Sequence, residues 1–278
     1  MTRRIPTTFL TVALLLAACG GEATRPELTD PTEILTAAAG QAAAAQGVHL
    51  NLTAEGSLAI DLTGAGGAPI DLTGSTAAAD IDLRGGDARL TFELPSLLGL
   101  RGELLSVDGA SYLKTTLTGA QYQVMNGLPD LSGGTDGSAD PSATPDARAI
   151  AAMVTALTDI LRRPGVDPAK GADVECGGKT CYTVTIDLTA EELATLMADA
   201  GTDGLPLPGG LPIPIPELGD ADVALTVLVT KDTNDLASLQ AVITFGAADE
   251  LTLDLTFSKW GTSVTVEAPP ADQVKGGG

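Results

Sequence analysis

The stretch "ELTLDLTF", Glu250–Phe257, decides the fold. From Leu251 onward an apolar residue stands at every second position, separated by threonine or aspartate. Because successive side chains of a β-strand point to opposite faces of a sheet, this alternation predicts a strand with one apolar and one polar face. Residues 223–229 and 239–245 alternate in the same way, and the short turns between these stretches indicate antiparallel neighbours. Residues 264–266 are expected to add a short last strand around Val264 and Val266.

The same period of two fills most of the first half of the chain. Residues 48–62 alternate on one parity, and residues 70–94 change parity after Gly74, which predicts a bulge or bend. Residues 104–115 are typical of a hairpin, with Asp108-Gly109 as its turn. The sequence therefore predicts a wide antiparallel sheet with one apolar face.

Three segments have the start and stop signals of helices. Asp30 is a suitable N-cap, and the alanine-rich residues 31–46 are expected to form a helix that stops at Gly47. A second helix is expected over residues 145–163, where apolar residues recur at helical spacing. A capping box opens a third helix over residues 189–201.

Three other segments are expected to lie between these elements. Residues 130–144 are acidic and rich in glycine, which indicates a loop. Residues 205–216 alternate proline with aliphatic residues, which favours a polyproline-like connector over a strand. Residues 231–235, "KDTND", lack the glycine and the bidentate acid of a calcium loop, so a hairpin turn is the better interpretation.

The N-terminus has the pattern of a bacterial lipoprotein signal. Two arginines precede the uncharged residues 5–18, a run shorter than the roughly 20 residues that a membrane-spanning helix needs. The residues "LAAC" at 16–19 match the lipobox, in which the cysteine is diacylated and becomes the first residue of the mature protein. We therefore expect a signal peptide over 1–18, a lipid anchor on Cys19 and a flexible tether over 19–30.

The net negative charge of the chain disfavours two classes of binding partner. Asp and Glu number 36 and Lys and Arg number 15, so the net charge is -21. Nucleic-acid binding needs a basic surface, so we expect no nucleic-acid partner. Docking onto anionic lipid head groups is disfavoured for the same reason. We expect a monomer that, if it binds lipid, holds it through the acyl chains.

The two remaining cysteines indicate a structural disulfide. Cys176 and Cys181 flank a Gly-Gly turn between two strand-like segments, and an exported protein can form disulfides. A redox site would have the tighter C-x-x-C spacing, and a zinc site would need two more soft ligands. We therefore expect the pair to connect the two strands of a hairpin.

No catalytic set stands out in the sequence. His49 is the single histidine, and it lies on the polar face of its strand with no nucleophile elbow nearby. A spatial pair of carboxylates of the glycosidase type stays open, but sugar sites usually stack aromatic residues, which make up only 3% of this chain. We expect no enzyme activity, no cofactor and no metal site.

The stretch "LTFSKWGTSVTVEAPP", Leu255–Pro270, resembles the end of the LppX/LprAFG family of mycobacterial (actinobacterial) cell-envelope lipoproteins. Its "SKWG" at 258–261, followed by a short strand and a double proline, carries most of the similarity. The segments "GVHLNL", "VDGASYLKT", "DPSATPD" and "VTIDLTAEELATLM" agree in order, so the resemblance spans about Glu33 to Pro270. The acidic loop, the "LPIPIP" run and the cysteine pair depart from the family.

The resemblance implies an α+β fold. In this fold a wide, U-shaped antiparallel half-barrel carries about three helices on its concave side and encloses an apolar cavity. We expect one such domain over residues 31–270 and a disordered tail over 271–278.

Strand parity and helix stripes suggest which residues line the cavity, although each of them is as well explained as ordinary core. The candidates from the strands and helices are Leu50, Leu52, Leu90, Phe92, Leu225, Val227, Ile243, Leu253, Met153, Leu157 and Met197.

The sequence supports three hypotheses about function. The first, implied by the resemblance, is a lipoprotein that binds acyl lipids or acylated glycolipids in its cavity and carries them across the cell envelope. Its expected partner is an envelope export protein. The second hypothesis is a structural or adhesion lipoprotein with a closed core that acts through a protein partner. The third is a hydrolase that uses His49. In the first two, the expected location is the extracytoplasmic face of the cell membrane or the surface of the envelope.

The lipid anchor can be tested by a single substitution. A Cys19→Ala protein lacks the thiol that is acylated, so we expect it to leave the membrane fraction of the producing cells. Immunoblotting of membrane and soluble fractions measures this. Retention of the variant in the membrane fraction would contradict the anchor.

Overall fold

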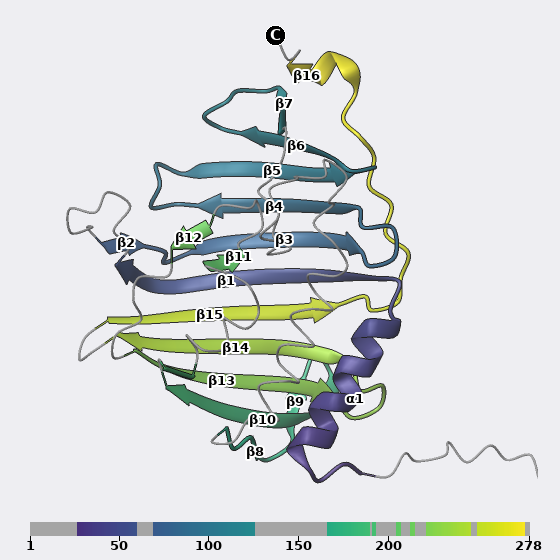
Figure 1. Cartoon of the computed structure of the whole chain (residues 1–278), viewed down its shortest axis with the longest axis vertical. Helices are drawn as coiled ribbons and strands as arrows, with labels where there is room; N and C mark the ends of the chain where they lie inside the picture. Colours follow the sequence, from purple (N-terminus) through teal and green to yellow (C-terminus); the bar gives the residue numbers. More distant parts are fainter. Residues whose placement is uncertain are drawn as a thin grey trace, which may run out of the picture.

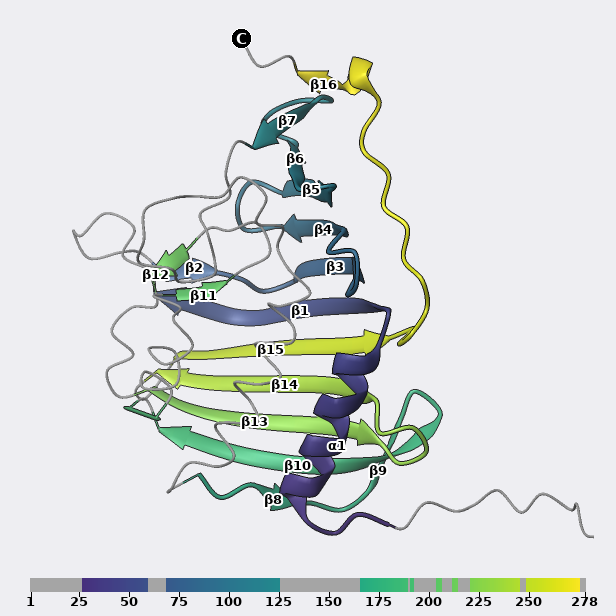
Figure 2. The ribbon, with the colours of Figure 1, turned by 45° about the vertical axis from the view of Figure 1, so that its right-hand side comes forward.

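The computed structural model describes residues 27–59, 69–125, 166–189, 191–192, 204–206, 212–214, 221–245 and 249–275. One large twisted sheet of 14 strands dominates them, and helix α1 (Pro31–Ala44) crosses one of its faces (Figure 1, Figure 2). The strands are β1 (Gly47–Ala59), β2 (Pro69–Asp71), β3 (Ser75–Asp82), β4 (Ala88–Leu94), β5 (Leu100–Val107), β6 (Ala110–Thr115), β7 (Tyr122–Met125), β8 (Ala169–Lys170), β9 (Val174–Cys176), β10 (Lys179–Thr189), β11 (Gly204–Pro206), β12 (Pro212–Pro214), β13 (Ala221–Thr230), β14 (Leu236–Phe245), β15 (Asp249–Ser258) and β16 (Val274–Lys275).

Strand β1 joins the two halves of the sheet. On one side it pairs with β3, and the order continues through β4, β5, β6 and β7 to β16. On the other side it pairs with β15, and the order continues through β14, β13 and β10 to β8. The pairs are antiparallel except for β16 and β7, which are parallel. The predicted wide antiparallel sheet is confirmed, and among the described strands β16 and β8 leave it open at its edges.

The register places the aliphatic residues of the central strands on one face. Val227 lies opposite Val184 and Leu239, and Leu255 lies opposite Leu239 and Leu52. Directly opposed residues of an antiparallel pair point to the same face, so these side chains form a continuous row. We call this face, on which α1 packs, the inner face, and the opposite one the outer face.

Helix α1 begins as predicted and ends earlier than predicted. The Asp30 Oδ1 accepts the backbone N–H groups of Thr32 at 2.7 Å and Glu33 at 3.2 Å, which caps the N-terminus. The helix ends at Ala44 instead of residue 46, and Gly47 opens β1. A Cβ on Gly47 would lie 2.5 Å from the carbonyl oxygen of Thr262, so the glycine permits the C-terminal segment to pass close by.

The second and third predicted helices lie largely outside the described residues. The start of the third is described, and its capping box is formed. The Thr189 Oγ1 accepts the backbone N–H of Glu192 at 3.3 Å, and the Glu192 carboxylate accepts the backbone N–H of Thr189 at 2.8 Å. This reciprocal pair is the arrangement that the sequence predicted.

The C-terminal segment differs from the prediction in two places. Val264 and Val266 form no strand; instead they pack in a small apolar cluster with Leu105, Val107 and other outer-face residues. The tail expected to be disordered from residue 271 contributes the 3-10 helix η1 (Ala271–Gln273) and strand β16, which pairs with β7 at the far edge of the sheet (Figure 1). Such a pairing between distant segments leaves no local pattern in the sequence.

The connector expected over residues 205–216 contains a short hairpin. Leu205 lies opposite Ile213 in the pair of β11 and β12, so the prediction that the whole segment is not a strand was wrong. Proline lacks a backbone donor but keeps its carbonyl, so it is tolerated in strands this short. The predicted turns are confirmed: Asp108 and Gly109, with φ of 52° and 78°, connect β5 to β6, and residues 231–235 connect β13 to β14.

Gly56 is expected to be indispensable for the register of β1. Its φ is 111°, and a Cβ there would collide with the carbonyl oxygen of Glu250 on β15. We expect Gly56→Ala to reduce the free energy of unfolding by about 2–4 kcal/mol. Chemical denaturation measures the change.

Gly40→Ala is the matched control for this prediction. Gly40 lies within α1, and no heavy atom comes within 4 Å of the added Cβ. Alanine is the better helix former, so this variant should gain about 0.5–1 kcal/mol. Equal effects of the two substitutions would contradict the close approach of β1 to β15.

Candidate functional site

The strand residues predicted to line a cavity share the inner face. Leu225 lies opposite Ile186 and Ala241, and Ala241 lies opposite Leu253. On the other side of β1, Leu90 lies opposite Ala79, which in turn faces Leu50. The register therefore brings all eight strand candidates to the side of the sheet on which α1 packs: Leu50, Leu52, Leu90, Phe92, Leu225, Val227, Ile243 and Leu253. Met153, Leu157, Met197 and Cys19 lie outside the described residues.

Helix α1 covers only one end of this face. Its Ile34 and Leu35 are buried in the same apolar cluster as Val229, Leu236 and Phe257. Among the described residues, α1 is the only helix of more than one turn on the inner face. The cluster is therefore closed by helix packing near the ends of β13 and β14 that lie beside α1 (Figure 1).

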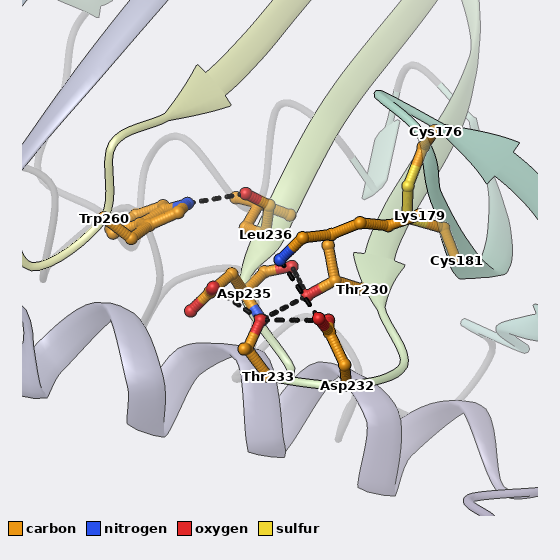
Figure 3. The surroundings of a disulfide bond; sticks show 9 residues. All are labelled: Cys176, Lys179, Cys181, Thr230, Asp232, Thr233, Asp235, Leu236 and Trp260. Carbon is orange, nitrogen blue, oxygen red and sulfur yellow. Dashed lines mark hydrogen bonds and ion pairs between the residues drawn. A yellow bond between two sulfur atoms is a disulfide. The ribbon is translucent and has the colours of Figure 1, made fainter.

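Trp260 anchors the end of the face that α1 covers. Its indole Nε1 donates to the carbonyl oxygen of Leu236 at 2.7 Å (Figure 3). Its ring stacks on Phe257 with 5.7 Å between centroids. Its polar atom is thus satisfied within the protein. Trp260 accordingly serves packing.

Some apolar side chains in the middle of the inner face are not fully buried. Val227 is fully buried, whereas Leu225, Leu253 and Leu50 are only half-buried although their strands lie in the centre of the sheet. Phe92 is also half-buried, and its ring lies over Gly102 of β5, in the space that a side chain there would occupy. Leucines in the middle of a sheet normally pack against a second layer, and here they keep part of their apolar surface exposed.

A hollow of about 310 Å³ lies elsewhere, at one end of β10, β13 and β14. The row of Asp187, Ala224 and Val242 that borders it points to the outer face, and none of the predicted lining residues contributes. Asp222 and Asp187 make its wall acidic. This hollow is therefore not the apolar cavity that the resemblance implies.

The N-terminal segment is held to the sheet by a group of residues that we call the N-terminal latch: Glu27, Leu28, Asp173, Tyr182 and Lys231. The Leu28 N–H donates to the Tyr182 hydroxyl at 3.0 Å. The Lys231 ammonium lies 2.6 Å from carboxylate oxygens of both Glu27 and Asp173, and 4.9 Å from the centre of the Tyr182 ring.

The charges of the latch stabilise each other. Hydrogen bonds to Asp173 and Glu27 raise the pKa of Lys231 well above its ordinary value. The hydrogen bond from Lys231 is the main cause that lowers the pKa of Asp173. Because the pKa of Asp173 is lowered, its carboxylate stabilises the fold at pH values above the ordinary pKa of an aspartate. This stabilisation is lost as the pH falls through the lowered pKa. Because the pKa of Lys231 is raised, its ammonium group stabilises the fold fully at pH values below the ordinary lysine pKa of 10.5. This stabilisation is lost only as the pH rises through the raised pKa. The latch is therefore closed across neutral pH.

The predicted disulfide lies beside the latch. Cys176 and Cys181 are bonded, with their Cα atoms 6.0 Å apart, across the turn between β9 and β10 (Figure 3). Gly177 and Gly178 form that turn with φ of 58° and 80°. The Lys179 ammonium lies 3.1 Å from Asp232, so the hairpin also contacts the β13–β14 turn. The interpretation as a structural link is confirmed.

Sequence reasoning missed an ionic cluster on the outer face. The Glu103 carboxylate, whose side chain is 12% exposed, accepts the Tyr122 hydroxyl at 2.6 Å and pairs with Arg89 at 2.6 Å and Lys114 at 3.0 Å. Burial alone would raise the pKa of Glu103, but these partners outweigh it and lower the pKa. All four groups are mutually satisfied, so the cluster stabilises the sheet and offers no free catalytic group.

His49 lies in a row with Asp80 and Ser258 on the outer face. Its Nδ1 is 2.7 Å from the Asp80 carboxylate, and Ser258 is its partner in the ladder with β15. No hydrogen bond between Ser258 and His49 is present in the described part of the chain, although a nucleophile must reach its base. The described residues also contain no group of three metal-ligating side chains.

Comparisons with known proteins identify similar structures but no similar sequences. No protein-family model matches the chain, and no curated protein matches it. LprF from Mycobacterium bovis has a TM-score of 0.49 at 17% identity, over 86% of this chain and 96% of that one. The lipoprotein LppX from Mycobacterium tuberculosis has a TM-score of 0.49 at 15% identity, over 85% of this chain and 98% of that one. Both names belong to the family that the sequence resembles.

Within the described residues, no helix is both long and apolar enough to span a membrane.

The latch can be opened by removing one hydroxyl. Tyr182→Phe keeps the buried ring but deprives the Leu28 N–H of its acceptor. Because one such hydrogen bond contributes about 1 kcal/mol, we expect the Leu28 amide to exchange with solvent roughly fivefold faster. Hydrogen exchange followed by NMR measures this rate.

Tyr112→Phe is the matched control, since Tyr112 packs in the separate cluster around Leu105 and Val107. It should leave the exchange of Leu28 unchanged. An unaltered rate in Tyr182→Phe as well would show that the latch does not hold the N-terminal segment.

Proposed function

We propose that this protein is a lipid-anchored carrier of the cell envelope that binds the acyl chains of lipids or glycolipids on its inner face. The observation that carries the proposal is the continuous aliphatic surface of the inner face, on which Leu50, Leu225 and Leu253 are not fully buried. Hydrocarbon chains are the ligand chemistry that matches such a surface.

The energetics of such binding are adequate for a carrier. Burying ten methylene groups stabilises a complex by about 8 kcal/mol at roughly 0.8 kcal/mol each. Loss of translational and rotational freedom offsets part of this gain. A gain of about 8 kcal/mol alone corresponds to a dissociation constant of about 1 μM, so a chain of ten methylene groups binds more weakly than this, and longer or multiple chains bind more tightly.

The rest of the surface fits a carrier that holds lipid by its chains. The net charge of -21 disfavours tight capture of anionic head groups. The polar side chains of the central strands, such as Asn51, Asp254 and Gln240, belong to the outer face, so water and lipid are separated by one layer of sheet. Carriage across the envelope, and delivery to or from an export protein, are the steps that we propose for it.

The latch supports an anchored mode of action. If Cys19 carries the acyl groups, the chain from Cys19 to Glu27 spans at most about 28 Å when fully extended. The salt bridge from Glu27 to Lys231 then fixes where this tether joins the folded part. The domain would thus stay close to the extracytoplasmic face of its membrane.

One observation favours a second candidate, a structural or adhesion lipoprotein with a closed core. Ile186, Val184 and Val227 have no exposed surface, and Leu251 is only 3% exposed. Part of the inner face is therefore sealed. In this alternative, the half-buried Leu50, Leu225 and Leu253 would be ordinary core residues, and the protein would act through a protein partner.

A matched pair of leucines on β13 tests the proposed carrier. Leu225 and Leu228 are both half-buried, but Leu225 belongs to the inner face and Leu228 to the outer face. We expect Leu225→Gln to reduce co-purifying lipid several-fold, because a buried amide without a partner costs about 1–3 kcal/mol. Leu228→Gln should retain the lipid of the parent protein. Native mass spectrometry of the full chain carrying Cys19→Ala measures bound acyl lipid.

A third variant guards against simple loss of folding. Ala241→Phe fills space on the inner face opposite Leu225 and introduces no polar group. It should also exclude lipid while its circular dichroism matches the parent. A bare polypeptide mass for the parent protein would refute the carrier and favour the closed core.

A further inference from the structure

Two turns at one end of the sheet expose three leucines to solvent. The turn between β4 and β5 carries Leu97 and Leu98, which are 41% and 96% exposed, and the turn between β6 and β7 carries Leu117, which is 75% exposed. We call residues 95–99 and 116–121 together the leucine turns. A single exposed leucine needs no explanation, but exposed apolar side chains that gather on one surface mark interaction sites.

The leucine turns are neighbours, and two hydrogen bonds join the start of β5, just after the first turn, to the second turn. Strands β4 and β6 run in the same direction, so the turns that follow them lie at the same end of the sheet (left in Figure 1). The Thr116 N–H donates to the carbonyl oxygen of Arg101 at 2.9 Å, and the Arg101 N–H donates to the Thr116 hydroxyl at 3.3 Å. The three leucines therefore belong to one surface.

The backbone holds Leu98 at the tip of its turn. Its φ is 57°, a left-handed conformation that favours glycine or asparagine over leucine. The Gly99 N–H bonds to the Pro95 carbonyl oxygen at 3.0 Å, and the Leu100 N–H bonds to that of Leu97 at 3.0 Å, which fixes the turn. The chain thus keeps a large apolar side chain at a position where it is both exposed and conformationally unfavourable.

The charge of this surface differs from that of the chain. Residues 94–102 and 115–121 contain no Asp or Glu, although the chain has 36 of them, and their one charged residue is Arg101. The preceding carboxylate, Glu93, is paired with Arg101 at 2.6 Å. The turn at Gly74 lies close to Pro95 of the leucine turns. Asp71, just before that turn, is an acidic residue at the edge of this surface. The leucine turns are therefore a place where this acidic protein can approach a lipid surface without repulsion.

We propose that the leucine turns insert into the interfacial region of a lipid layer and dock the protein on it. Narrow apolar tips suit a fluid interface, which closes around them, whereas a protein partner would need a shaped pocket for each leucine. This contact uses a surface separate from the inner face, so it stands even if the inner face binds no acyl chain. The N-terminal latch lies at the other end of the strands, because the β13–β14 turn that carries Lys231 is opposite to the leucine turns (Figure 1).

A fluorescent label beside the leucines tests the insertion. Ser96→Cys places a thiol on the exposed β4–β5 turn and keeps all three leucines. Asp108→Cys is the control, since Asp108 is exposed at the opposite end of β5 and also has a positive φ of 52°. Both variants carry Cys19→Ser in the full chain, so that the introduced thiol is free while Cys176 and Cys181 are bonded. The thiol carries a polarity-sensitive fluorophore, and phosphatidylcholine vesicles contain a spin-labelled lipid as quencher.

We expect vesicles to shift the emission of the residue 96 label to the blue and to quench it, and to leave the residue 108 label unchanged. Leu97→Ser/Leu98→Asn/Leu117→Ser in the Ser96→Cys chain should weaken vesicle partition at least about tenfold, because burial of even one leucine is worth roughly that factor. Asparagine tolerates the left-handed backbone at residue 98, so the triple variant should keep its circular dichroism.

Three results would overturn the insertion. The first is no quenching at residue 96, and the second is equal quenching at residues 96 and 108. The third is a blue shift that appears without vesicles and grows with protein concentration, which would assign the leucine turns to contacts between copies of the chain. Bound acyl lipid in native mass spectra is unaffected by any of them, so failure here leaves the proposed carrier standing.

Discussion

The pairing of β1 with β15 is the constraint on which the rest of the structure depends. It aligns His49 with Ser258 and Gly56 with Leu251, and so joins segments from the two ends of the folded chain. A slip of one residue would turn every leucine of one strand to the wrong face. Because the register is kept, the aliphatic residues of both halves form one inner face, and α1 can seal one end of it.

The separation of apolar and charged groups by a single sheet explains the proposed function. Aliphatic side chains such as Leu225 and Leu253 face inward and are not fully buried, whereas Glu103 on the outer face is bound by Arg89 and Lys114. The charge of Glu103 is thus neutralised by neighbouring strands on the outer face. The apolar surface of these leucines that stays exposed lies on the inner face, beyond the part that α1 covers. This distribution suits a ligand made of hydrocarbon.

Local patterns predicted the parts of the fold that local chemistry controls. Asp30 caps α1, residues 189–192 form their capping box, Asp108-Gly109 turns its hairpin, and Cys176 bonds to Cys181. The strand parity also placed the eight strand candidates on one face, although it cannot decide whether they line a cavity.

The features that were missed depend on contacts between distant segments. The pairing of β16 with β7 and the bond from Leu28 to Tyr182 have no local signal. The sequence predicts Gly47 as a helix stop, whereas the structure uses this glycine to let Thr262, which is distant in sequence, pass close by.

The most direct test of the account asks whether a fatty acid lies against the inner face. In a protein with ¹³C-labelled leucine methyl groups, a fatty acid that carries a nitroxide should broaden the NMR signals of Leu225 and Leu253. The signal of Leu228, on the outer face of the same strand as Leu225, should be broadened much less. Equal broadening of all three, or none at saturating fatty acid, would contradict the claim that the inner face holds acyl chains.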